Sequence, residues 1–253
     1  VTGGRRTKSG LYRVRYIGGE SPAPSGQAAF AEAKRARELR RRLELYHSRR
    51  SIEGVGLAWE HLGSDDPWIR HAARVALENQ ALVQWQLPAL TESNTKKALT
   101  ALMALARSGD LKVQSQIFGR LGDLPWETLP AQWQLVALRS YQLAFTRMGG
   151  RRPGDRAPII SKIVKASEAA PELRMEVARL LIYLEAPGIV PGLLNYVVDA
   201  KSPEERMFYL FHMRHIAKGW TSAHRRAYFA WLKKMTDTGG VRQLELSFKH
   251  IVA

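Results

Sequence analysis

The chain has 253 residues, 45% of them hydrophobic, and its 39 Lys and Arg against 23 Asp and Glu give a formal net charge of +16. It contains no cysteine, which excludes disulfides, thiolate zinc sites, c-type haem attachment and cysteine nucleophiles from this segment. The positive charge favours acidic partners, such as nucleic acid, an anionic polysaccharide, an acidic membrane face or an acidic protein. No apolar run approaches the roughly 18 residues of a membrane span, so no transmembrane segment is predicted.

The first 26 residues differ in pattern from the rest. Residues 11–17 alternate apolar and basic positions between glycines, which predicts one β-strand. A single strand needs a partner strand, and no later stretch offers one. Residues 21–26, Ser-Pro-Ala-Pro-Ser-Gly, predict a linker. Because the chain begins at Val1 without an initiator Met or an apolar leader, we expect it to be a segment cut from a longer protein.

From residue 27 onward the periodicity is helical. Between Phe30 and Tyr46 apolar residues recur three or four positions apart, with basic residues on the opposite face. Further helices are predicted between turns that contain Gly, Pro or capping residues. They cover residues 51–62, 68–78, 95–107, 111–121, 130–148, 157–169, 172–185, 190–200, 203–218 and 222–238. The predicted fold is therefore all-α, an α-solenoid of stacked helical pairs over residues 27–253, preceded by a terminal strand and linker in residues 1–26.

Two stretches resemble helices of HEAT repeats. Asp66-Pro67 followed by Trp68-Ile69-Arg70 and small apolar residues resembles the second helix of such a repeat, which Asp-Pro opens. Residues 172–194 resemble a HEAT helix, a turn and the start of the next pair. The resemblance implies that the predicted solenoid is HEAT-like.

Two other stretches are similar to one multidomain family. Residues 10–18 resemble the closing strand of a β-propeller of the sorbosone/glucose dehydrogenase type, and residues 219–240 resemble a late segment of the same family. These large planctomycete- and verrucomicrobial-type proteins are described as membrane-bound dehydrogenases or haem-binding Cys-x-x-Cys-His proteins. Their order is propeller, HEAT-like region, cytochrome c.

The resemblance implies a role for this chain as the middle region of such a protein. It would be a non-catalytic scaffold that spaces a dehydrogenase-like propeller from a cytochrome c-like domain, its partners in the same chain, in the periplasm or cell envelope. The redox chemistry belongs to those other modules, because this chain lacks a Cys-x-x-Cys-His motif. We therefore predict no catalytic residue, cofactor or metal in this segment.

Basic residues are the candidate contacts for a partner. A solvated face, or one that pairs with the propeller, is favoured over a phosphate-binding groove. The alternative is a basic solenoid in the cytoplasm that binds nucleic acid or another polyanion. A DNA-processing site would also need Asp155 or Asp237 near Trp220 and Trp231, which the sequence cannot place. The candidate contacts are Arg35, Arg40, Arg41, Arg42, Arg49, Arg50, Arg151 and Arg152.

A histidine pair and an aromatic cluster near the C-terminus are interpreted as structural features rather than functional sites. His212 and His215 are three apart on a predicted helix, but Glu204 and Glu205 fall on another face, so surface or partly buried histidines are favoured over a metal site. The aromatic residues of 220–231 are expected to pack in the core, with Arg225 and Arg226 at the rim. We expect the helices to stack without leaving a pocket for chemistry.

Overall fold

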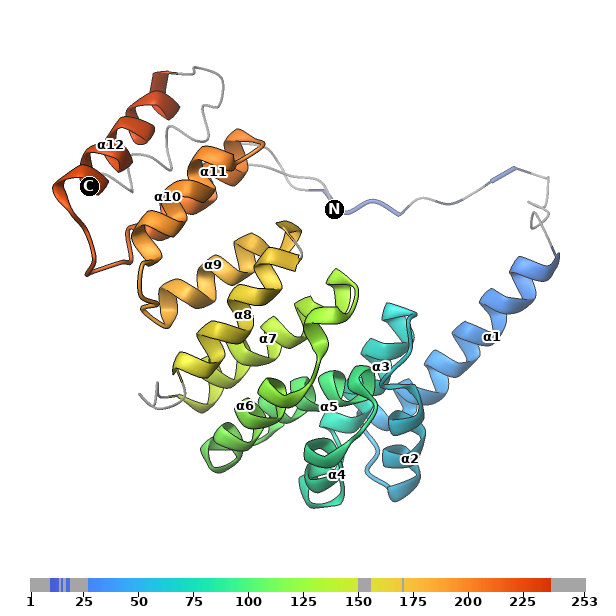
Figure 1. The fold of residues 1–253 in the computed structure, drawn as a ribbon. Coiled ribbons are helices and arrows are strands. Elements are labelled where there is room, and N and C mark those ends of the chain that lie inside the picture. Colours follow the sequence, from blue (N-terminus) through green and yellow to red (C-terminus); the bar gives the residue numbers. More distant parts are fainter. Residues whose placement is uncertain are drawn as a thin grey trace. The chain divides into compact units, whose positions relative to one another are not determined.

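The structure is a computed structural model that describes residues 10–13, 15, 17–18, 27–149, 156–169 and 171–237. Within these residues it contains twelve α-helices and no β-strand, which confirms the predicted all-α class (Figure 1). The helices are α1 (Gln27–Glu44), α2 (Ile52–His61), α3 (Pro67–Glu78), α4 (Gln86–Thr91), α5 (Thr95–Ser108), α6 (Gln114–Asp123), α7 (Ala131–Met148), α8 (Arg156–Ala169), α9 (Arg174–Tyr183), α10 (Ile189–Asp199), α11 (Pro203–Met213) and α12 (Ser222–Asp237).

The chain divides into two compact units, residues 1–39 and 40–253. In the first unit the described residues of the predicted strand, Leu11, Tyr12 and Ile17 among them, are exposed and form no strand. The predicted linker, residues 21–26, lies outside the described residues. The predicted strand is therefore not shown, and the domain boundary after residue 26 stays a prediction.

Capping residues start several helices where the sequence predicts them. The Asp66 carboxylate accepts hydrogen bonds from the backbone N–H of Trp68 at 2.8 Å and of Ile69 at 3.3 Å, with Pro67 in the first turn of α3. The Ser51 hydroxyl likewise accepts from the backbone N–H of Gly54 at 3.1 Å and starts α2. These side chains satisfy N–H groups that have no partner within the helix.

Within residues 40–253, the helices pack on near neighbours in the chain. One series runs through α3, α5, α7, α9 and α11, in which each helix contacts the next. In a second series α4 contacts α6 and α6 contacts α8, and α10 contacts α12. Consecutive helices also pair, as α2 with α3, α4 with α5 and α10 with α11 (Figure 1). Each helix therefore shares its apolar surface with helices close to it in sequence.

The composition of α5 suits a central place among these helices. It contacts α3, α4, α6 and α7, so apolar residues are needed around most of its circumference. Small residues alternate with leucines, which lets the neighbouring helices approach closely. The buried apolar residues are Ala98, Leu99, Ala101, Leu102, Ala104, Leu105 and Ala106.

Two helix predictions were wrong. The short helix α4 was not predicted, since it has six residues and contains Pro88. The helix predicted over 203–218 ends at Met213, and residues 214–218 form a turn and loop instead. This loop contributes to the candidate site.

The end of α9 places a non-glycine residue in a left-handed conformation. Glu185 has a φ of 54°, and the backbone N–H of Ala186 donates to the carbonyl of Leu181 at 3.0 Å, the bond that closes a Schellman turn. Glycine is the usual residue at this position because it has no Cβ to clash. Glu185 also lies 3.6 Å from Arg156, in an exposed ion pair.

We expect Glu185→Gly to raise the free energy of unfolding by about 0.5–1 kcal/mol, because relief of the left-handed strain exceeds the loss of an exposed ion pair. Urea denaturation followed by circular dichroism measures this change. The control Glu185→Ala removes the same ion pair but keeps a Cβ, so it should give no gain. A loss of stability in Glu185→Gly would show that the ion pair of the Glu185 carboxylate stabilises the fold by more than the left-handed backbone destabilises it.

Candidate ligand pocket and basic surface

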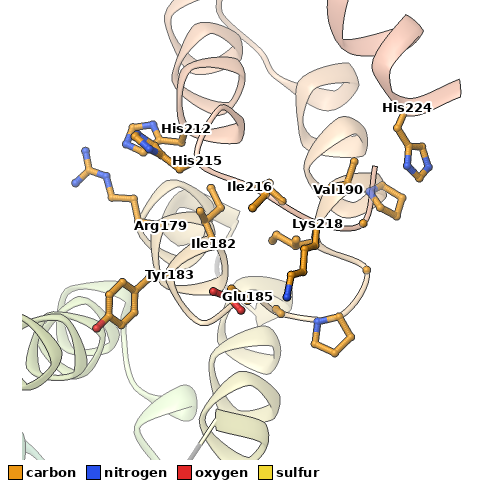
Figure 2. Close-up of a pocket in the computed structure, with 17 residues that line it drawn as sticks. Arg179, Ile182, Tyr183, Glu185, Val190, His212, His215, Ile216, Lys218 and His224 are labelled. Carbon is orange, nitrogen blue, oxygen red and sulfur yellow. The ribbon is translucent and has the colours of Figure 1, made fainter. Parts of the chain in front are cut away.

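A pocket of about 740 Å³ lies where four helices of the second unit meet (Figure 2). It is bounded by the end of α9, the start of α10, the loop after α11 and the start of α12. Helix stacking thus leaves a sizeable hollow here, while the expectation that no pocket serves chemistry stays a prediction. The lining residues are Arg179, Ile182, Tyr183, Glu185, Ala186, Pro187, Gly188, Ile189, Val190, Pro191, His212, His215, Ile216, Ala217, Lys218, Gly219 and His224. A smaller hollow of about 330 Å³ shares Arg179 and Tyr183 with it.

Two glycine turns lie at the edges of the pocket. Gly188, with a φ of 70°, precedes α10 and has no side chain to cap that helix, so the positive end of the helix dipole is uncapped in the pocket. Gly219, with a φ of 86°, turns the chain between α11 and α12. The walls between these turns are apolar side chains such as Ile182, Val190 and Ile216.

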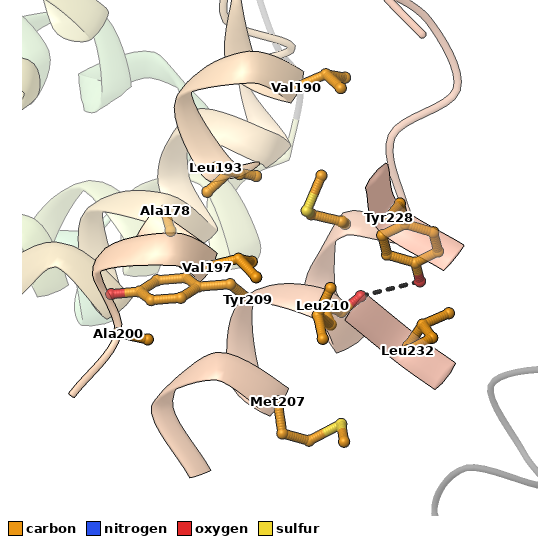
Figure 3. Close-up of a cluster of buried hydrophobic side chains, with 11 residues drawn as sticks. Ala178, Val190, Leu193, Val197, Ala200, Met207, Tyr209, Leu210, Tyr228 and Leu232 are labelled. Carbon is orange, nitrogen blue, oxygen red and sulfur yellow. Dashed lines mark hydrogen bonds between the residues drawn. The ribbon is translucent and has the colours of Figure 1, made fainter. Parts of the chain in front are cut away.

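A buried cluster supports the pocket from α10, α11 and α12 (Figure 3). The hydroxyl of Tyr228 on α12 donates to the carbonyl of Leu210 on α11 at 3.1 Å. The indole N–H of Trp220 donates to the carbonyl of Ile216 at 2.8 Å, and this bond holds the loop that forms one wall. The first bond joins the two helices that flank the loop, and the second lies within the loop.

The predicted core packing of the aromatic residues is confirmed in part. Tyr228 and Leu232 are buried, and Trp220 and Trp231 pack against the same cluster while partly exposed. Phe229, in contrast, is 60% exposed and lies outside the core. The aromatic residues therefore act mainly as packing groups beneath the pocket.

The charged groups around the pocket differ in their partners. Arg179 lies 3.3 Å from Glu176 and 4.9 Å from the centre of the Phe208 ring. The carboxylate of Glu185 pairs with Arg156. Lys218 is exposed and makes no ion pair with any residue that the structure describes.

His212 is oriented by one backbone hydrogen bond and has a lowered pKa. Its Nδ1 lies 2.8 Å from the carbonyl of Phe208 and donates to it, so Nε2 is left as an acceptor. Burial lowers the pKa of His212, the hydrogen bond to Phe208 partly opposes this effect, and the nearby guanidinium of Arg179 lowers the pKa further. Among the residues that the structure describes, no group of three His, Asp or Glu is close enough to hold a metal ion. The Glu205 carboxylate instead accepts a hydrogen bond from the Tyr209 hydroxyl at 3.1 Å.

The predicted basic contacts fall into four groups. Arg41, Arg42 and Arg49 are exposed and make no ion pair within the described part of the second unit. Two others have partners: Arg40 pairs with Glu44 at 3.1 Å, and Arg50 donates to the carbonyl of Asn79 at 3.2 Å. Arg35 is exposed in the first unit. Arg151, Arg152 and Asp155 lie outside the described residues, as does the side chain of Asp237.

The turn that carries Arg49 and Arg50 is held by one buried amide. The side-chain nitrogen of Gln80 donates to the carbonyls of Tyr46 and Arg49, both at 3.1 Å, and its oxygen accepts from the backbone N–H of Ser51 at 2.8 Å. The same nitrogen also contacts the carbonyl of Ala76 at 3.0 Å, so its two hydrogens are shared among three carbonyls while the side chain holds this turn against the end of α3. Sequence patterns gave no sign of this role.

No helix among the described residues is long and apolar enough to cross a membrane, in agreement with the prediction of no transmembrane segment. Comparison with protein-family models, with curated proteins and with solved structures found no match to this chain.

Proposed function

We propose that the chain is a non-catalytic scaffold, in which residues 40–237 form a HEAT-like α-solenoid. The observation that carries the proposal is the succession of contacts through α3, α5, α7, α9 and α11, alongside contacts from α4 to α6 and α6 to α8. Stacked repeats contact their neighbours in this way and present long surfaces to partners. The scaffold sets the spacing of whatever is attached at its two ends.

The proposed partners are a dehydrogenase-like propeller and a cytochrome c-like domain of the same protein, in the periplasm or cell envelope. This part of the proposal is supported by the resemblance of residues 10–18 and 219–240 to that family. Sequencing the gene on both sides of this segment tests it. Propeller repeats upstream and a Cys-x-x-Cys-His motif downstream would support it, and the absence of both would contradict it.

The alternative function is binding of nucleic acid or another polyanion in the cytoplasm. The observation in its favour is that Arg41, Arg42 and Arg49 are exposed without an ion pair in the described part of their unit. Such arginines can neutralise phosphates and release counterions. A solvated face of a scaffold would also expose arginines without ion pairs. The scaffold and the polyanion-binding function are therefore distinguished by how replacement of these arginines changes DNA binding.

We expect Arg41→Gln/Arg42→Gln and the control Arg225→Gln/Arg226→Gln to weaken binding of duplex DNA equally. Both variants remove two positive charges from exposed helix positions, and a scaffold attracts DNA only through its net charge. Fluorescence titrations with duplex DNA and with heparin at two salt concentrations measure this effect.

A different result would favour the alternative. In that case duplex DNA would bind with a dissociation constant of about 1 μM or lower near physiological salt. The slope of log K plotted against log salt concentration would fall in magnitude by about 1.8 in Arg41→Gln/Arg42→Gln alone. The control variant would keep the original slope. This outcome would contradict the scaffold.

A further inference from the structure

The pocket between α9, α10, α11 and α12 has the dimensions of a small-molecule site. Its volume of about 740 Å³ lies inside the range of roughly 300–1,000 Å³ that is usual for such sites. Most of its walls are apolar, with Ile182, Ile189, Val190 and Ile216 among them. Burial of apolar ligand surface against these side chains provides the driving force for binding.

The charges in the pocket select the sign of the ligand. Arg179 and Glu185 are already engaged by Glu176 and Arg156. Lys218 makes no ion pair within the described residues, and Figure 2 shows it among the lining side chains beside Ile216. A cation without a partner beside apolar walls matches a ligand that has one negative charge and an apolar body.

We infer that this pocket binds a small apolar molecule that carries a carboxylate, with Lys218 as the partner of the carboxylate and the isoleucine-rich walls around the apolar body. A single negative charge fits better than a phosphate dianion, because a phosphate would need several free donors. His212 already donates from Nδ1 to the carbonyl of Phe208, and its lowered pKa disfavours a second positive charge in the pocket. The inference is independent of the scaffold function.

Isothermal titration calorimetry of the full chain with decanoate, and with decanol as the neutral analogue, tests the inference. We expect decanoate to bind about three to five times more tightly than decanol, as a partly exposed ion pair allows. Lys218→Gln should remove this difference by weakening decanoate alone. Lys201→Gln, an exposed lysine outside the pocket, is the matched control and should leave both affinities unchanged.

A second pair of variants tests the apolar wall. Ile189→Glu places a carboxylate in the pocket at the start of α10, where an acidic residue is compatible with helix formation. We expect Ile189→Glu to weaken the binding of decanoate by about tenfold or more. The neutral control Ile189→Gln should weaken the binding of decanoate and of decanol to the same extent.

Three outcomes would overturn the inference. The first is no heat of binding for either probe, and the second is equal affinity for decanoate and decanol in the unmodified chain. The third is binding of a short leucine-rich peptide through its free C-terminal carboxylate without binding of decanoate, which would assign the pocket to a peptide.

Discussion

Replacing Trp133 with alanine is expected to lower the free energy of unfolding by about 3–5 kcal/mol, the usual cost of removing a large buried aromatic residue. Trp133 is fully buried at the start of α7. The guanidinium of Arg70 lies 4.5 Å and the ammonium of Lys96 5.3 Å from the centre of its ring. Its indole N–H also lies 3.4 Å from the Asp65 carboxylate. The substitution therefore removes contacts to α3, to α5 and to the turn before α3 at once.

The charged groups around Trp133 also stabilise its buried position. The ammonium of Lys96 donates to the Asp65 carboxylate at 2.7 Å, and this hydrogen bond is the main cause of the lowered pKa of Asp65. The ring thus packs beneath an ion pair and beside a second cation. Cations over an indole face add a further attraction to its burial.

Trp68→Ala is the matched control, since Trp68 is 70% exposed in the first turn of α3. It should change the free energy of unfolding by no more than about 0.5 kcal/mol. Urea denaturation followed by far-ultraviolet circular dichroism measures both variants. Equal effects of the two substitutions would show that Trp133 is not the packing centre of α3, α5 and α7.

Gln80→Leu is expected to lower the free energy of unfolding by about 3 kcal/mol, although leucine and glutamine have similar volumes. The substitution leaves the carbonyls of Tyr46 and Arg49 and the N–H of Ser51 without the partner that Gln80 provides. Each buried polar group that loses its hydrogen bond costs about 1–3 kcal/mol, and access of water to the opened turn reduces the sum.

Hydrogen exchange separates this local effect from a general loss of stability. The amide of Ser51 should exchange faster in Gln80→Leu under conditions where α5 keeps its protection. Gln84→Leu, at an exposed position, is the control. Its free energy of unfolding should lie within about 0.5 kcal/mol of that of the unmodified chain. Unchanged exchange at Ser51 would contradict the role assigned to Gln80.

The fold class and most helix positions could be predicted because their signals are local. The start of α3 depends on Asp66 and Pro67, which act on the residues next to them. The helix α4 was missed because its six residues have little periodicity of their own, and they follow Trp85, which is fully buried by tertiary contacts. The end of α11 was placed too late because Ile216 continues the apolar spacing, yet its carbonyl binds Trp220 in a loop.

The candidate site could not be predicted from the sequence in the same way. The ends of four helices form the pocket, and residues from 179 to 224 meet there only after folding. Nothing in the sequence distinguishes Lys218 from the other exposed lysines. Gly188 and Gly219 were the available signals, since each interrupts an apolar helical pattern, but a glycine at a helix end does not show whether a hollow follows.

The succession of contacts between near neighbours also has a kinetic consequence. Residues that touch within the second unit are mostly close in sequence, so little loop entropy has to be lost before each contact forms. Among small domains, chains rich in such local contacts fold faster than chains dominated by distant pairings. The helices around α5 could therefore nucleate first, and later helices would add to that nucleus in turn.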